Sequence, residues 1–189
     1  MKKFRLRYNS PVVLTFALIS LAVLLINDVT EGESRRLLFS VYSFSPDQPL
    51  GYVRLVTHVL GHTSWEHYTG NITLMLVIGP ALEHRYGSHT VLLCIVFTAV
   101  VTGLAQCILF PGVALCGASG VVFMMILLSS MGGHRGGGIP LTMVIVMIFY
   151  LGSEVSAAIS VRDNISRLSH ILGGLCGAGI GFYLASRER

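Results

Sequence analysis

The chain has 189 residues, which fits one domain, so we expect a single membrane domain over residues 1–189. Hydrophobic residues make up 53%, charged residues 12%, and mean hydropathy is +0.73. A soluble domain carries about 25% charged residues. The composition therefore excludes intrinsic disorder, an ordinary cytosolic enzyme and a protein that binds nucleic acid. The net charge of +4 calls for an explanation from membrane topology.

The first apolar segment covers residues 11–26 and contains no charged residue. It follows a stretch over residues 2–7 that holds four basic residues. This combination fits either a signal peptide or a retained transmembrane helix. Residues 27–30 offer no cleavage site between small residues, and further apolar segments follow. We therefore favour a retained first transmembrane helix.

Five more apolar segments follow, each near the roughly 20 residues that cross the hydrocarbon of a bilayer. Clusters of glycine, proline or charged residues separate them. The predicted spans are residues 66–84, 88–110, 113–131, 139–158 and 169–186. The fold class expected is all-α, a polytopic bundle of six transmembrane helices.

Counting lysine and arginine gives the orientation of this bundle. With the N-terminus inside, eight basic residues fall in inner segments and five in outer segments. The count favours both termini in the cytoplasm. The first outer loop, about residues 28–64, is long and partly apolar, so we expect it to be embedded in the membrane interface.

Ser119 lies among small residues, in the sequence Cys116-Gly117-Ala118-Ser119-Gly120. Small residues by themselves indicate close helix packing in lipid. A helix starting at Pro111-Gly112 would place Ser119 about one turn from its N-terminus. Free backbone N–H groups and the positive end of the helix dipole lie there, which suits a developing oxyanion.

His170 opens the last predicted span, and Gly173 and Gly177 share its helical face. Such a stripe permits tight packing against another helix with small residues. If that helix carries Ser119, the imidazole can take the proton of the hydroxyl and activate it as a nucleophile. A histidine that merely rests at the membrane interface is the plainer alternative.

His67 and Asn71 are four residues apart and share a helix face, so both can donate hydrogen bonds toward one point. Bonds to a neighbouring helix are the structural alternative. His58 and His62 have the same spacing, but no nearby cysteine or His-Glu-x-x-His pattern favours a metal site. No acidic residue stands beside His170 in the sequence, so a Ser-His dyad is the simplest interpretation.

These motifs together resemble the rhomboid family of intramembrane serine proteases. The family's Gly-x-Ser-Gly corresponds to residues 117–120, its His-x-x-Gly-x-x-x-Gly to residues 170–177, and its His-x-x-x-Asn to residues 67–71. The stretch ending in Glu83 is similar to the family's Gly-x-x-x-Glu, and Arg54 to the arginine of its Trp-Arg motif. The chain differs from the family pattern at Val53, where tryptophan is usual, and at Phe123, where tyrosine is common.

The resemblance implies that Ser119 is the nucleophile and His170 the general base and acid. It also implies that His67, Asn71 and the Ser119 N–H form the oxyanion hole, and that Phe123 packs on the His170 ring. No metal or cofactor is implied. The supporting residues it implies are Gly117, Gly120, Gly173, Gly177, Arg54 and Glu83.

The implied substrates are single-span transmembrane proteins cut near the outer membrane face, with the lipid bilayer as the other partner. The implied location is the plasma membrane, as a multi-pass protein of bacterial type. Three alternatives stay open: a non-catalytic binder of transmembrane segments, a channel or transporter that uses the histidines, and a specialised branch that trims C-terminal sorting tails.

Overall fold

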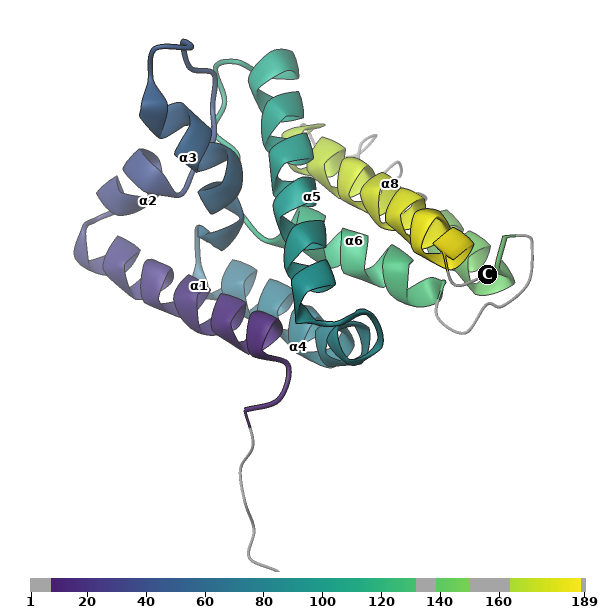
Figure 1. Cartoon of the computed structure of the whole chain (residues 1–189). Helices are drawn as coiled ribbons and strands as arrows, with labels where there is room; N and C mark the ends of the chain where they lie inside the picture. The colour runs from purple at the N-terminus through teal and green to yellow at the C-terminus, as the bar shows by residue number, and fades with distance from the viewer. Residues whose placement is uncertain (1–7, 132–138, 150–163, 188–189) are drawn as a thin grey trace, which may run out of the picture.

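The computed structural model describes residues 8–131, 139–149 and 164–187. The described residues form an all-α fold, as predicted (Figure 1), and residues 141–149 are also helical. Within these ranges one isolated β-bridge joins Val41 and Leu115. The helices are α1 (Pro11–Val29), α2 (Glu33–Leu38), α3 (Pro49–Thr57), the 3-10 helix η1 (His58–Leu60), α4 (Trp65–Tyr86), α5 (Ser88–Leu109), α6 (Ser119–Ser130) and α8 (Asn164–Arg187).

Three of the described helices are long and apolar enough to cross a membrane. They are α1, α5 and the Arg167–Arg187 part of α8. Helix α6 is apolar but shorter, with 12 residues. The predicted span over residues 139–158 is helical at 141–149, and its end lies outside the described residues.

The ends of the first helices follow local sequence signals. Pro11 occupies the first turn of α1, where its missing N–H has no helical partner to lose. The Ser64 hydroxyl caps α4 by accepting the His67 backbone N–H at 3.2 Å. Gly87, at φ 82°, separates α4 from α5. The predicted boundaries between the second and third spans therefore agree with the structure to within about two residues.

The predicted span over residues 113–131 begins too early. Helix α6 starts at Ser119, so Ser119 is the first helical residue rather than one turn inside the helix. Residues before it bond elsewhere: Leu115 exchanges two backbone hydrogen bonds of 2.9 Å with Val41. The N–H of Gly117 donates to the His58 carbonyl at 3.0 Å. These hydrogen bonds pair the backbone N–H and C=O groups of this segment without a helix. Their partners are distant in the sequence, so the local pattern of apolar residues does not predict them.

The long first loop is folded rather than extended, because it contains α2, α3 and η1. Arg54 is buried in it, and its Nε donates to the Leu37 carbonyl at 2.8 Å. The Arg54 guanidinium also lies 4.5 Å from the centre of the Tyr42 ring. Arg54 therefore joins α3 to α2 and to the segment that follows α2.

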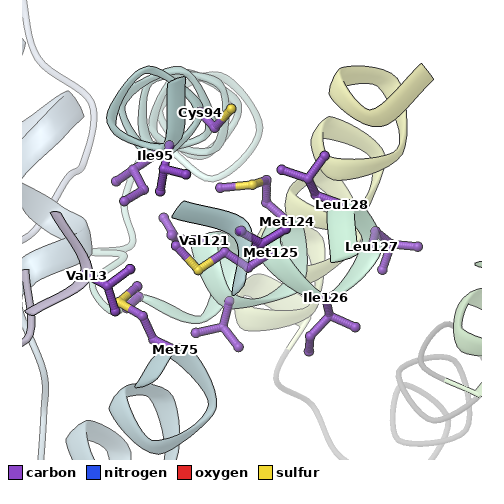
Figure 2. Packing of buried hydrophobic residues seen from close by; sticks show 14 of the residues in the cluster. Val13, Met75, Cys94, Ile95, Val121, Met124, Met125, Ile126, Leu127 and Leu128 are labelled. Carbon is purple, nitrogen blue, oxygen red and sulfur yellow. The ribbon is translucent and has the colours of Figure 1, made fainter. Parts of the chain in front are cut away.

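Helix α6 runs through the main hydrophobic core. Figure 2 shows α6 residues in one cluster with Val13 of α1, Met75 of α4 and Ile95 of α5; the labelled α6 residues are Val121, Met124, Met125, Ile126, Leu127 and Leu128. Eight of the twelve α6 residues are buried, which explains why the helix is apolar on all sides. Helix α6 is packed against α4, α5 and α8.

Helices α6 and α8 lie side by side and pack more extensively than any other described pair (Figure 1). A Cβ atom at Gly173 would lie 2.0 Å from the Gly120 carbonyl oxygen, and one at Gly177 would lie 2.2 Å from that of Met124. Neither position has room for a side chain. The glycine stripe expected from the spacing thus allows the two backbones to touch.

We predict that Gly177→Ala destabilises the bundle, because its methyl group would collide with backbone that cannot move aside. The expected loss is about 2–3 kcal/mol of unfolding free energy. The matched control is Gly179→Ala, since a Cβ there meets nothing within 4 Å. Thermal unfolding in detergent micelles should show a lowered midpoint for Gly177→Ala only, and equal midpoints would contradict the packing argument.

Candidate functional site

Ser119 follows directly after a turn that only glycine fits. Gly117 has a φ of 128°, and a Cβ there would lie 2.7 Å from Cε1 and 2.8 Å from Nε2 of His67. Glycine is therefore required at this position for two reasons: the backbone has a positive φ, and the imidazole of His67 lies too close for a Cβ atom. The first N–H groups of α6, beginning with that of Ser119, have no acceptor within the helix.

His170 lies in α8, on the turn that faces the start of α6. A Cβ at Gly120 would lie 3.1 Å from the Ser169 carbonyl oxygen, and Gly173 touches Gly120 directly. The His170 ring stacks on Phe123, with centroids 4.4 Å apart and planes 7° from parallel. Phe123 is on α6, one turn after Ser119, so the stack fixes the His170 ring plane against the helix that carries the serine.

His67 reaches the same region from the first turn of α4. Its imidazole lies over Gly117, two residues before Ser119. One turn later, Asn71 is buried, and its Nδ2 has no hydrogen-bond partner among the described residues. Buried donors in proteins are nearly always paired, so an unpaired one needs an explanation, and binding of a ligand or of water is one.

The two other histidines of this region have different surroundings. His58 is 1% exposed, with Nδ1 at 3.1 Å from the Arg54 carbonyl and Nε2 at 3.4 Å from the Thr102 hydroxyl. The His62 ring packs edge-on against His67, with centroids 5.1 Å apart. Burial lowers the pKa of His58 to about 4 and that of His62 to about 4. His58 is thus a structural residue of η1.

The described residues contain no group of three His, Cys, Asp or Glu side chains placed to hold a metal ion. The metal alternative for His58 and His62 therefore gains no support from the geometry. Instead, Nδ1 of each histidine lies within hydrogen-bond distance of a backbone carbonyl. His58 Nδ1 faces the Arg54 carbonyl, and His62 Nδ1 lies 3.2 Å from the Leu60 carbonyl.

Glu83, which the resemblance gives as a supporting residue, lies far from Ser119 at the other end of α4. It is sixteen residues from His67 on α4, which corresponds to about 24 Å along a helix. Its buried carboxylate accepts the backbone N–H groups of Val12 at 3.0 Å and Val13 at 3.1 Å, and the Ser88 hydroxyl at 2.6 Å. A carboxylate at a helix N-terminus is stabilising, so Glu83 anchors α1 to α4 and α5.

Sequence reasoning missed several residues that shape the loop before Ser119. Gln106 of α5 is 1% exposed, and its Nε2 donates to the Val113 carbonyl at 2.8 Å. The Ser43 hydroxyl donates to the Cys107 carbonyl at 2.6 Å. A buried amide within an apolar span was a usable signal for Gln106. No feature of the sequence around Ser43 predicted its hydrogen bond to α5.

We predict that Gly117→Ala destabilises the protein, because alanine would be strained at this φ and its methyl group would press on the His67 ring. The expected loss is about 1–3 kcal/mol. Gly112→Ala, in the same non-helical segment, is the control, since a Cβ there meets nothing within 4 Å. The measurement is the thermal midpoint in detergent, and a Gly117→Ala midpoint equal to that of the control would refute the claim.

We also predict that stability falls below neutral pH. Burial holds the pKa of His58 at about 4 in the folded state, below its ordinary value of 6.5. The unfolded chain therefore binds a proton first as the pH drops, and up to about 3 kcal/mol of stability is lost between pH 6.5 and pH 4. Denaturant unfolding at several pH values in this range measures the unfolding free energy, which should fall less steeply with pH in His58→Gln than in the wild type. His84→Gln is the control for loss of a histidine, because His84 is exposed.

Sequence comparison with known proteins identifies the family of this chain. The rhomboid domain family matches residues 49–187. Rhomboid-related protein 2 of Mus musculus is 26% identical over 167 residues, covering 79% of this chain and 54% of that protein. Rhomboid protease GlpG of Yersinia pestis (strain Pestoides F) is 23% identical over 177 residues, covering 92% of this chain and 62% of that protein. The aligned part thus spans between 54% and 62% of these relatives. With its apolar helices and this match, the chain is a membrane protein and belongs to the rhomboid family.

Proposed function

We propose that the protein is an intramembrane serine endopeptidase with a Ser119–His170 dyad. The observation that carries this proposal is the contact between the start of α6 and the Ser169–Gly173 turn of α8. It brings the serine turn and the histidine turn together from distant parts of the chain. The family membership, with a relative named as a rhomboid protease, supports the same reaction class.

In the proposed reaction, the Ser119 hydroxyl oxygen attacks the scissile carbonyl while His170 accepts its proton. His170 then donates that proton to the leaving amine. An imidazole can act in this way only if its ring is held in a suitable plane. The parallel stack on Phe123 supplies such a constraint, because it restricts rotation of the ring.

The oxyanion of the tetrahedral intermediate needs hydrogen-bond donors placed before the reaction starts. We assign this role to Nε2 of His67, Nδ2 of Asn71 and the backbone N–H of Ser119. Two observations support the assignment. His67 Nε2 lies against the loop that precedes Ser119, and Asn71 Nδ2 is buried with no partner in the described structure. A donor left unpaired in the resting enzyme is free to bind the developing charge.

The proposed substrates are single-span transmembrane proteins in the same bilayer. The site lies at the N-terminal ends of α4 and α6, so it is near one end of the bundle. A substrate helix hides its carbonyls in hydrogen bonds, and the cleaved segment must therefore unwind before attack. We place this end at the outer face of a bacterial plasma membrane, in a six-span bundle with both termini in the cytoplasm and the first loop embedded in the interface. The mechanism uses neither a metal nor a cofactor.

We predict that Ser119→Ala and His170→Ala each lower cleavage of a single-span reporter in proteoliposomes by at least about 10³-fold. Ser129→Ala is the serine control on α6, because its hydroxyl bonds the Ile126 carbonyl and lies away from the site. His89→Ala is the histidine control, on exposed surface of α5. Both controls should cleave at the wild-type rate.

A fluorophosphonate probe separates this proposal from a non-catalytic binder. The proposed enzyme should be labelled at Ser119, and labelling should be lost in His170→Ala because the hydroxyl is then not activated. Undiminished cleavage by both variants would show that the dyad is wrong. Reporter binding without cleavage or labelling would favour a binder of transmembrane segments.

A further inference from the structure

Two neighbouring hydroxyl groups precede α4, and both bond His67. The Ser64 hydroxyl accepts the backbone N–H of His67, at 3.2 Å. The Thr63 hydroxyl oxygen lies 3.2 Å from Nδ1 of the His67 ring. Ser64 therefore fixes the main chain of His67, which is an ordinary helix cap. Thr63 contacts the side chain, which no capping rule requires.

The His67 ring is confined on three sides. Thr63 lies at Nδ1, the edge of His62 packs against the ring with centroids 5.1 Å apart, and Gly117 lies at the Nε2 side. The Nε2 atom is 2.8 Å from the position that a Cβ of residue 117 would take. The ring thus lies between Thr63 and the loop that precedes Ser119.

The protonation of this ring decides whether it can act as a donor. A neutral imidazole carries one proton, on either Nδ1 or Nε2, and the hydrogen bond at one nitrogen determines which. To donate toward an oxyanion beside Gly117, His67 needs its proton on Nε2 and a lone pair on Nδ1. The Thr63 hydroxyl can donate or accept, and in this arrangement it donates its proton to that lone pair. In the other tautomer, the Nε2 lone pair would face the negative oxygen and repel it.

We propose that Thr63 is a positioning residue that holds His67 in the Nε2–H tautomer, with its donor directed at the oxyanion. This inference rests on the proposed function, since it assigns His67 to the oxyanion hole. Thr63 does not touch the reacting atoms, and it acts only through the His67 ring. Removal of its hydroxyl should therefore weaken binding of the transition state and leave binding of the substrate helix intact.

The kinetic test compares three variants of the full chain in proteoliposomes with the single-span reporter. Thr63→Val keeps the side-chain shape without the hydroxyl, and kcat should fall about fivefold, equal to about 1 kcal/mol, with KM unchanged. Thr63→Ser keeps the hydroxyl and should restore most of the rate. Thr69→Val is the control on α4, because the Thr69 hydroxyl bonds the Trp65 carbonyl at 2.9 Å and no imidazole. The proposal would be overturned if Thr63→Val had the kcat of the wild type. It would also be overturned if kcat fell as far in Thr63→Ser as in Thr63→Val.

A spectroscopic test does not depend on activity. In histidine-15N-labelled protein carrying Ser119→Ala, the His67 signals are assigned by their loss in His67→Gln. The nitrogen shifts should report the Nε2–H tautomer, and Thr63→Val should shift the population toward the other tautomer. An unchanged population in Thr63→Val would reject the role of Thr63 even if the enzyme cleaves through Ser119. Cleavage that survives Ser119→Ala would instead reject the proposed function and leave the tautomer result standing.

Discussion

The direct backbone contact between α6 and α8 is the constraint on which the rest of the site depends. Within lipid, helices gain little from burying apolar side chains, so close packing must supply much of the stabilisation. Gly173 against Gly120 and Gly177 against Met124 provide this packing, since even a methyl group would not fit. The same contact brings the Ser169–Gly173 turn, which carries His170, onto Gly120, the residue after Ser119. Stability of the bundle and geometry of the candidate site thus have one physical origin.

The first loop supplies the second constraint, because it determines how α6 begins. Its Val41 pairs with Leu115, and the carbonyl of its His58 accepts the N–H of Gly117. These bonds keep the segment before Ser119 out of the helix, so the serine stands at the helix N-terminus with free N–H groups beside it. The loop is therefore part of the construction of the site, and Arg54 holds it together from within.

Buried polar residues of this chain divide into two groups. The first group is paired inside the protein: Glu83 binds the N-terminus of α1, Gln106 binds the loop, and His58 contacts the Arg54 carbonyl. The second is exemplified by Asn71, whose Nδ2 has no partner among the described residues. A polar residue in a membrane segment is a candidate functional group by default. Pairing alone does not single out Asn71, because Ser20 and Thr98 also have a buried oxygen without a partner among the described residues. Its place one turn after His67 makes Asn71 the candidate for binding.

The sequence alone determined the apolar helices, the glycine stripe of α8 and the motif residues that indicate the family, because these follow from composition and from spacing along one helix. Only the tertiary structure decided that α6 starts at Ser119, that Glu83 binds the N-terminus of α1, and that Thr63 contacts His67. The first two depend on bonds to α1 and to the first loop, and the third on how one ring rotates. A one-dimensional pattern carries the period of a helix, but it does not record which distant backbone group satisfies a given hydrogen bond.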